Sequence, residues 1–342
     1  MGRNGAAPQP PSMGARVRAH SVVVTVLTLV VTLTLADQLS SKLGPTGVAG
    51  AGGSLTPSSS PSASVAAASP TPSATPDGSP RVVYAAGDIA DCPDTDPAVA
   101  GLVRDRKALI LAVGDIVYPS GQASGFTSCF DPVWGALKPR IRPVPGNHDY
   151  ITRDAAAYFT YFGAAAGDPG RGYYSFDIGA WHVIAINSMC PQIGGCRPGS
   201  PQIIWLEQDL AAHPGGCTLA YWHHPRFSSG DGASPQRTEA MWQALYAAGA
   251  EIVINGHDHD YERFAPLDPA GRVDPQRGIR EFVVGTGGAN LTRRVRVADH
   301  SEIWTRAYHG LLELTLRPGR YHWRFVAAET QRVIDSGSGR CH

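Results

Sequence analysis

The chain has 342 residues, and its 29 basic and 29 acidic residues give a formal net charge of zero. This balance argues against a nucleic-acid partner bound through a basic surface. Hydrophobic residues make up 43% of the chain, which is enough for a sizeable core and excludes disorder throughout.

The first 36 residues are typical of an export signal. Residues 1–20 carry three arginines and no acidic residue, and residues 21–36 are uncharged and mostly apolar. These sixteen residues would span about 24 Å as a helix, less than the ~30 Å of a bilayer core, which favours a cleaved signal peptide. An uncleaved signal anchor is the alternative, and it would be the chain's one contact with a membrane. In both cases we expect the rest of the chain to be extracytoplasmic, either secreted or tethered to the outer face of the cytoplasmic membrane.

Residues 37–80 form the second predicted segment. From residue 44 they are almost entirely Gly, Pro, Ser, Thr and Ala, and they lack the large apolar side chains that offset the entropy of folding. We therefore expect a disordered linker over 37–80 and a folded catalytic domain over 81–342.

From residue 81 onward, short apolar stretches alternate with helical patterns. Five predicted strands each run into a polar cluster, at 82–86, 109–113, 141–145, 219–222 and 252–255. Helices are predicted over 99–107, 202–212 and 236–249, and hairpins over 174–187, with its turn at Gly179, and over 310–327. Strands with crossover helices and hairpins indicate mixed α/β architecture.

All six cysteines follow the linker, at 92, 129, 190, 196, 217 and 341. An even number in an exported chain predicts three disulfides. Cys190 and Cys196 flank a short Gly/Pro-rich loop, so we expect them to pair. A bond between Cys217 and Cys341 would fasten the C-terminus, which leaves Cys92 with Cys129. A cysteine zinc site is disfavoured because no C-x-x-C motif occurs.

The five predicted strands end in residues that can bind metal ions: Asp88, Asp115, Asn147, His223 and the pair His257 and His259. Ligands of open α/β sheets gather beyond the carboxyl ends of the strands. Oxygen and imidazole donors without a thiolate suit iron, manganese or zinc. One Gly-Asp after a strand is usually only a turn, but five such clusters in succession predict a metal site.

In chain order these clusters resemble the motifs of the calcineurin-like metallophosphoesterases. They read GDIA at 87–90, GDIVY at 114–118, GNHD at 146–149, WHHP at 222–225 and GHDHDYER at 256–263. Two positions resemble the purple acid phosphatase branch. Residue 90 is Ala where many relatives of the wider family have a histidine, and Tyr118 lies three residues after Asp115. The resemblance covers 81–342 and implies a four-layer α/β/β/α sandwich with mixed sheets.

The resemblance also implies two metal ions. The first would be bound by Asp88, Asp115, Tyr118 and His259, and the second by Asp115, Asn147, His223 and His257. We expect Asp115 to bridge them because a carboxylate has two oxygens. We expect His257 and His259 to point to opposite sides of an extended segment. A Tyr118 phenolate implies Fe(III) at the first position, with Zn, Mn or Fe(II) at the second; if Tyr118 is only a core aromatic, the site could hold Zn, Mn or Fe(II).

Three further residues are candidates for catalysis. His148 would stabilise the transition state or protonate the leaving group, and Asp149 would orient it; a structural loop histidine is the alternative for His148. His224 either touches the substrate or packs in the core. Glu262 and Arg263 are expected to pair and brace the His259 segment.

One stretch departs from the pattern of the plant-type purple acid phosphatases. Those enzymes carry further histidines a few residues beyond the position of His223, whereas residues 227–235 contain none. This puts an acidic pH optimum in doubt.

The expected function is an exported phosphomonoesterase in which a metal-bound hydroxide attacks the phosphorus of a small phosphate ester. A phosphodiesterase or nucleotidase using the same site is the first alternative. A wall-bound module without catalysis is a remote one, because no ligand of the motif set is missing.

Overall fold

The computed structural model describes residues 78–92 and 97–342. The predicted signal segment and nearly all of the predicted linker therefore lie outside the described residues. Among the helices that the structure does describe, none has the length and apolar character needed to cross a bilayer.

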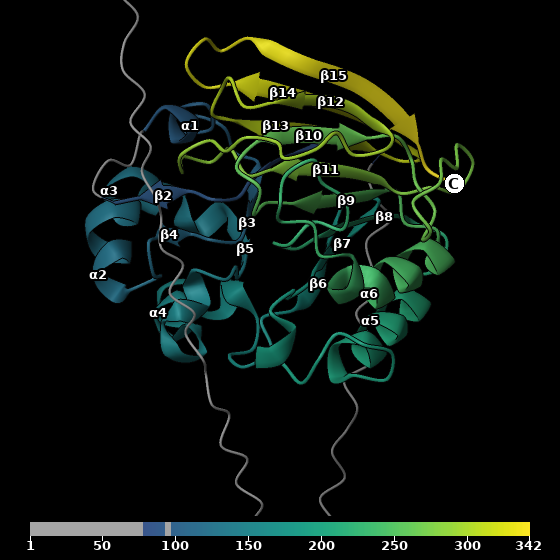
Figure 1. Cartoon of the computed structure of the whole chain (residues 1–342), viewed down its shortest axis with the longest axis horizontal. Coiled ribbons are helices and arrows are strands. Elements are labelled where there is room, and N and C mark those ends of the chain that lie inside the picture. The colour runs from purple at the N-terminus through teal and green to yellow at the C-terminus, as the bar shows by residue number, and fades with distance from the viewer. Residues whose placement is uncertain (1–77, 93–96) are drawn as a thin grey trace, which may run out of the picture. The chain divides into compact units, whose positions relative to one another are not determined.

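Within the described residues the strands form a six-stranded, a seven-stranded and a two-stranded sheet (Figure 1). The six-stranded sheet has the order β15-β14-β13-β1-β3-β5. Its strands are β1 (Arg81–Ala86), β3 (Leu109–Val113), β5 (Ile141–Val144), β13 (Gly310–Arg317), β14 (Arg320–Ala327) and β15 (Val333–Arg340). The first three are parallel to one another, and β13 pairs antiparallel with β1, so the sheet is mixed.

The seven-stranded sheet has the order β12-β10-β11-β9-β8-β7-β6. Its strands are β6 (Tyr174–Ile178), β7 (Trp181–Ala185), β8 (Cys217–Tyr221), β9 (Ile252–Asn255), β10 (Tyr261–Phe264), β11 (Arg280–Val284) and β12 (Ser301–Thr305). Strands β7, β8, β9 and β11 run parallel, and the remaining pairs are antiparallel. The two-stranded sheet joins β2 (Ala90–Asp91) to β4 (Val117–Tyr118).

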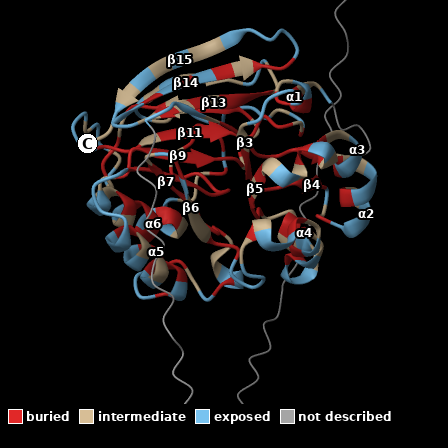
Figure 2. Cartoon of the chain, turned by 180° about the vertical axis from the view of Figure 1, so that it is seen from behind, coloured by how far each residue is buried: buried red, intermediate tan, exposed pale blue. Residues whose placement is uncertain are grey.

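The helices fall into two groups. The first contains α1 (Ala98–Gly101), α2 (Ala123–Gly125), α3 (Asp131–Trp134) and α4 (Ala156–Phe162), and the second contains α5 (Pro201–Ala212) and α6 (Pro235–Ala248). Figure 1 shows the two groups on opposite sides of the stacked sheets. The strands are largely buried, whereas the helices expose their outer faces (Figure 2).

The layers follow from the two-residue period of the strands. In β1, Val83 and Ala85 belong to the core between the two large sheets, whereas Tyr84 and Ala86 pack with the first helix group. In β9, Ile252 and Ile254 face the same central core, and Val253 packs against the α5–α6 layer. The result is the expected four-layer α/β/β/α sandwich.

All six cysteines are among the described residues, and they form the expected pairs Cys92–Cys129, Cys190–Cys196 and Cys217–Cys341. The last bond joins the first residue of β8 to the C-terminal segment after β15. It therefore lies at the end of β8 that is remote from His223.

The predicted strands and hairpins are confirmed to within two residues, but the helix predicted over 99–107 is wrong. Only Ala98–Gly101 is α-helical. The guanidinium of Arg140 donates to the carbonyl oxygens of Val103, Arg106 and Ala108, and Val103 O also accepts the backbone N–H of Arg106 in a turn that does not continue the helix. Helices α2–α4 and strands β2, β4, β10, β12 and β15 were not predicted.

Candidate metal centre

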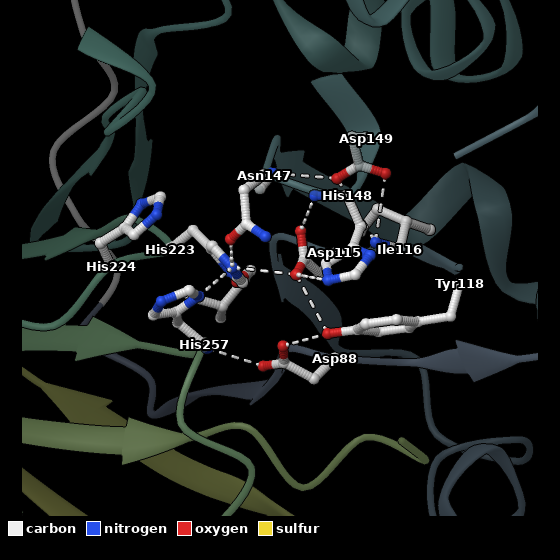
Figure 3. A network of polar contacts seen from close by, with 12 residues as sticks. Asp88, Asp115, Ile116, Tyr118, Asn147, His148, Asp149, His223, His224 and His257 are labelled. Atoms are coloured by element: carbon white, nitrogen blue, oxygen red, sulfur yellow. Dashed lines mark hydrogen bonds and ion pairs between the residues drawn. The ribbon is translucent and has the colours of Figure 1, made fainter. Parts of the chain in front are cut away.

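The predicted site residues follow the carboxyl ends of five strands and converge at one place (Figure 3). Asp88, Asp115 and Asn147 follow β1, β3 and β5, and His223 and His257 follow β8 and β9. The first three strands are parallel in one sheet, and the other two are parallel in the other. The site therefore lies where the edges formed by the carboxyl ends of these strands meet in the two sheets.

The backbone at this edge is strained. Asp88, Asp115 and His257 have φ angles of 60°, 48° and 73°, a region that non-glycine residues rarely occupy. Such outliers persist when surrounding structure holds them, and they cluster at functional sites. A glycine is needed at position 146 so that the backbone can approach the Asp115 carboxylate, because a Cβ there would lie 2.1 Å from Asp115 Oδ1.

A first group of donors surrounds the Tyr118 hydroxyl. It lies 2.6 Å from Asp88 Oδ1, 3.0 Å from Asp115 Oδ2 and 3.0 Å from His259 Nε2. His259 Nε2 is also 3.3 Å from Asp88 Oδ1. Donors bound about 2.1 Å from one ion lie roughly 3 Å apart, so these four atoms have the spacing of a ligand set.

A second group surrounds His223 Nε2. That atom lies 3.2 Å from Asp115 Oδ2, 3.1 Å from Asn147 Oδ1 and 3.2 Å from His257 Nδ1. Nitrogen and carboxylate atoms of Asp115, His223 and His257 all lie within 4.8 Å of one another. The two groups thus correspond to the two ligand sets that the resemblance implied.

The groups meet at a single oxygen of Asp115. Oδ2 belongs to both, whereas Oδ1 accepts the backbone N–H of His148 at 2.8 Å. The geometry therefore favours Oδ2 as the atom shared by both groups, whereas the expectation was that the two oxygens would serve one ion each. Asp88 is arranged in the same way, since its Oδ2 accepts the backbone N–H of His257 at 2.8 Å.

Backbone carbonyls orient two of the imidazoles. His223 Nδ1 donates to Val113 O at 2.9 Å, and His259 Nδ1 donates to Asn290 O at 2.8 Å, which leaves the Nε2 lone pairs free to bind an ion. His257 presents its Nδ1 to the cluster. His257 and His259 do reach different groups, but residues 257–260 form successive bends and not the extended segment that was expected.

The electrostatics favour bound cations. Asp88 and Asp115 are 0% and 1% exposed, and their ion-pair partners in the described part of the chain are histidines. Burial lowers the pKa of His223, but Asp115, Asp88 and the Val113 carbonyl together outweigh burial and raise this pKa to about 9. Burial, together with Asp88 and Asp115, raises the pKa of the Tyr118 phenol far above its usual value. A phenolate therefore requires a cation beside it, and the oxygen and imidazole donors fit iron, manganese or zinc.

His148 lies at the rim of the cluster. Its Nδ1 donates to Pro119 O at 2.6 Å, and its Nε2 is 3.9 Å from Asp115 Oδ2. Its side chain is 31% exposed. One ring nitrogen is thus fixed by the backbone while the other faces the shared oxygen, where a substrate can reach it.

Asp149 does not contact the His148 ring, so the expectation that it orients this ring is wrong. Its carboxylate accepts the backbone N–H groups of Gly146 at 2.9 Å and of Ile116 at 3.2 Å. It therefore ties together the two loops that carry Asn147 and Asp115. The group that orients His148 is the Pro119 carbonyl, which no side-chain pattern could have revealed.

His224 is 4% exposed, and both of its ring nitrogens are hydrogen-bonded. Arg237 Nη1 donates to Nε2 at 2.8 Å, and Nδ1 contacts Ser188 Oγ at 2.9 Å. Its ring lies beside that of His257 (Figure 3), with ring centroids 4.4 Å apart. These contacts favour the packing alternative for His224.

The expected pairing of Glu262 with Arg263 is also wrong. Arg263 pairs with Glu302 and with Asp335, whose Oδ2 lies 2.7 Å from Arg263 Nε. Glu262 is 0% exposed and accepts the backbone N–H of Ser229 at 2.7 Å. Neighbouring residues of β10 point to opposite faces of the sheet, so their partners come from different segments.

Comparisons with known proteins identify related phosphoesterases. Residues 75–261, which include all seven predicted metal ligands, match the family model described as "Calcineurin-like phosphoesterase". Purple acid phosphatase 15 of Arabidopsis thaliana is 27% identical over 262 residues, which cover 64% of this chain and 47% of that protein. Purple acid phosphatase 23 of the same plant is 26% identical over 252 residues, which cover 61% and 53%. The chain thus spans about half the length of these curated relatives.

A solved structure supports the fold. Purple acid phosphatase PPD1 from yellow lupin (Lupinus luteus) seeds aligns with a TM-score of 0.66 and 18% identity, over 78% of this chain and 54% of that one. Because the family model covers more than half of the chain, the chain belongs to the calcineurin-like phosphoesterase family.

Proposed function

We propose that this protein is a phosphomonoesterase that uses two metal ions. The observation that carries the proposal is the shared oxygen, Asp115 Oδ2, which lies 3.0 Å from the Tyr118 hydroxyl and 3.2 Å from His223 Nε2. Two complete donor groups around one bridging atom are what a two-ion phosphoesterase site needs. The names of the matched relatives, which are purple acid phosphatases, support the same activity.

Two ions bound here would neutralise phosphate oxygens and lower the pKa of a water molecule. The chain supplies the remaining groups. His148 Nε2 faces the site and is placed to hold a proton for the leaving oxygen, while the Pro119 carbonyl keeps the other ring proton in place. Asp149 acts indirectly, by holding the Asn147 and Asp115 loops in register.

The donor chemistry guides the choice of metals. We infer Fe(III) in the group that contains Tyr118, because a trivalent cation most strongly favours a phenolate. Asn147 contributes a neutral oxygen to the other group, which suits a divalent ion such as Zn, Mn or Fe(II).

We further propose that the protein is exported. Residues 1–36 would direct export, residues 37–80 would form a linker, and residues 81–342 would form the catalytic domain. Three disulfides support an oxidising compartment. The substrates would then be small phosphate esters outside the cytoplasm.

A comparison of two esters tests the activity. The full chain is produced through an oxidising compartment, purified without chelators and analysed for bound metals. We expect about two ions per chain and a higher kcat/KM for p-nitrophenyl phosphate than for bis-p-nitrophenyl phosphate, between about pH 5 and pH 9.

The other outcomes are equally informative. A preference for the diester would replace the proposal with the phosphodiesterase alternative. A preparation that contains both ions but hydrolyses neither ester would contradict the enzymatic proposal and favour the non-catalytic module.

A further inference from the structure

The segment after His223 lacks the histidines that plant-type purple acid phosphatases carry there. Residues 227–235 contain no basic side chain, and the first one beyond them is Arg237. Arg237 lies in the first turn of α6 (Pro235–Ala248). The amino end of a helix carries a partial positive charge, so a cation there is electrostatically unfavourable. Its presence calls for a compensating partner.

Arg237 has no acidic partner among residues 78–92 and 97–342. Within the described residues the side chain makes one hydrogen bond, from Nη1 to His224 Nε2 at 2.8 Å, and no carboxylate lies at ion-pair distance. An arginine has five N–H donors, so four remain available. The half-buried guanidinium therefore has charge and donors that the protein leaves uncompensated.

His224 connects this guanidinium to the metal centre. The His224 ring lies 4.4 Å from the His257 ring and 5.0 Å from the His223 ring, measured between centroids. Because arginine can only donate, His224 Nε2 must accept, and its Nδ1–H then donates to Ser188 Oγ at 2.9 Å. The buried His224 ring is thus fixed at both nitrogens, contacts the guanidinium through Nε2 and packs against the rings of two members of the second donor group.

We propose that Arg237 binds a terminal oxygen of the substrate phosphate and thereby selects phosphomonoesters over phosphodiesters, with His224 as the residue that positions it. This inference rests on the proposed function and specifies its substrate class. A monoester dianion has three terminal oxygens and two charges, whereas a diester has two terminal oxygens and one charge. A planar guanidinium recognises the extra charged oxygen, which esterification removes.

Substitution of Arg237 tests the selection directly. For Arg237→Gln we expect kcat/KM for p-nitrophenyl phosphate to fall about 10- to 100-fold and that for bis-p-nitrophenyl phosphate to change less than about threefold. Arg237→Lys keeps the charge without the planar fork and should recover part of the loss. Metal content should equal that of the wild type in both variants.

Arg293→Gln is the matched control. It removes the same charge from an exposed loop on the His259 side of the cluster. Measured at about 1 M salt, where charges are screened beyond ~3 Å, this variant should keep the wild-type ratio of the two kcat/KM values. An equal change in that ratio for Arg293→Gln and Arg237→Gln would mean that general charge, not contact, sets the preference, and would overturn the proposal.

Binding of inorganic phosphate provides a readout that does not depend on turnover. Calorimetry should show phosphate binding to metal-loaded wild type and Arg293→Gln, and binding weaker by about tenfold or more to Arg237→Gln. Unchanged phosphate affinity would overturn the proposal. If the wild type binds phosphate through Arg237 but hydrolyses neither ester, the proposed function fails while the binding site stands.

The role of His224 is tested by rescue. His224→Leu removes the acceptor for Arg237 and should lower the ratio of monoester to diester kcat/KM, with a rise in KM for the monoester. His224→Gln retains an acceptor oxygen and should recover part of that ratio. A residue that only supports packing would change both substrates equally in the two variants.

Discussion

The two oxygens of Asp115 have different partners. Oδ1 accepts the backbone N–H of His148, and Oδ2 belongs to both donor groups. Asp115→Asn would replace one oxygen by an amide that cannot bridge two cations. We expect loss of at least one ion and a fall in kcat of more than tenfold, measured by elemental analysis and by p-nitrophenyl phosphate hydrolysis.

Asp168→Asn is the control for Asp115→Asn, since that carboxylate is 61% exposed and its ion-pair partner is the exposed Arg171. It should keep both ions and full activity. Activity above about a tenth of the wild type in Asp115→Asn, with both ions bound, would refute the bridging role.

His148 offers a test of catalysis without metal binding. Its Nδ1 is bound to Pro119 O, so His148→Ala should leave the donor groups intact. We expect both ions to be retained and kcat to fall by about 10²–10⁴, most strongly for alkyl phosphates, whose leaving groups need a proton. Loss of metal would show instead that His148 is structural, and an equal loss for good and poor leaving groups would exclude proton donation.

Tyr118 decides the metal of the first group. If it binds Fe(III) as a phenolate, the protein should be coloured by a charge-transfer band, and Tyr118→Phe should abolish that band. The ring still packs, so the folded state should persist, which circular dichroism can check. A visible band that survives the substitution would remove Tyr118 from the ligand set.

The hairpin of β6 and β7 is attached to α5 by a second cluster of ionisable groups. His182 of β7 lies 2.9 Å from Asp177 Oδ1 and 2.8 Å from Asp209 Oδ2, and its ring stacks on that of His213 at 3.8 Å. The donors lie close enough for a metal, but rings stacked at 15° do not direct two lone pairs to one point. We therefore interpret the cluster as a structural clamp.

The clamp predicts a pH-dependent stability. Burial lowers the pKa of His182, but the two aspartates outweigh it, so the folded-state pKa lies above the ordinary value. Stabilisation by the protonated ring is then complete below about pH 6.5 and is lost as pH rises through the folded-state pKa. At about pH 6 the free energy of unfolding of the wild type should exceed that of His182→Gln by about 1–3 kcal/mol. This difference should be smaller at about pH 9.

Thermal unfolding at the two pH values measures this difference. His322→Gln, which replaces an exposed histidine of β14, is the control and should follow the wild type at both. A stability difference between the wild type and His182→Gln that grows with pH would have the opposite pH dependence and would refute the clamp.

The disulfides stabilise the molecule as a whole. The Cys217–Cys341 bond closes 124 residues of chain, whereas Cys190–Cys196 closes 6. In the chain-entropy description the long loop contributes about 5 kcal/mol and the short one about 2 kcal/mol. Cys217→Ala/Cys341→Ala should therefore lower the free energy of unfolding more than Cys190→Ala/Cys196→Ala.

Denaturant unfolding of the two double variants tests this order. Because Cys217 lies at the far end of β8 from His223, metal content and kcat of folded Cys217→Ala/Cys341→Ala should remain those of the wild type. Equal losses of stability in the two variants would contradict the loop-length argument.

Most strands and six of the seven predicted ligands could be read from local patterns, whereas the four-layer sandwich and Tyr118 were implied by the resemblance to the metallophosphoesterases. Each donor directly follows, or lies within a few residues of, the end of an apolar strand, and parallel strands bring their carboxyl ends together. Helices α2–α4 escaped prediction because they have only three, four and seven residues, too few for a helical period to be recognised. The 99–107 helix was overpredicted because its carbonyls bind Arg140, which lies on a different segment.

The sequence alone therefore establishes which residues reach the site, because strand periodicity and strand ends are local properties of the chain. It does not establish what those residues touch. Four features all join segments distant in the chain: the single bridging oxygen of Asp115, the Pro119 carbonyl on His148, the pairing of Arg263 with Asp335 and the hydrogen bond from Arg237 to His224. Such contacts depend on how the two sheets and the helices pack against each other, and only the tertiary structure decides that packing.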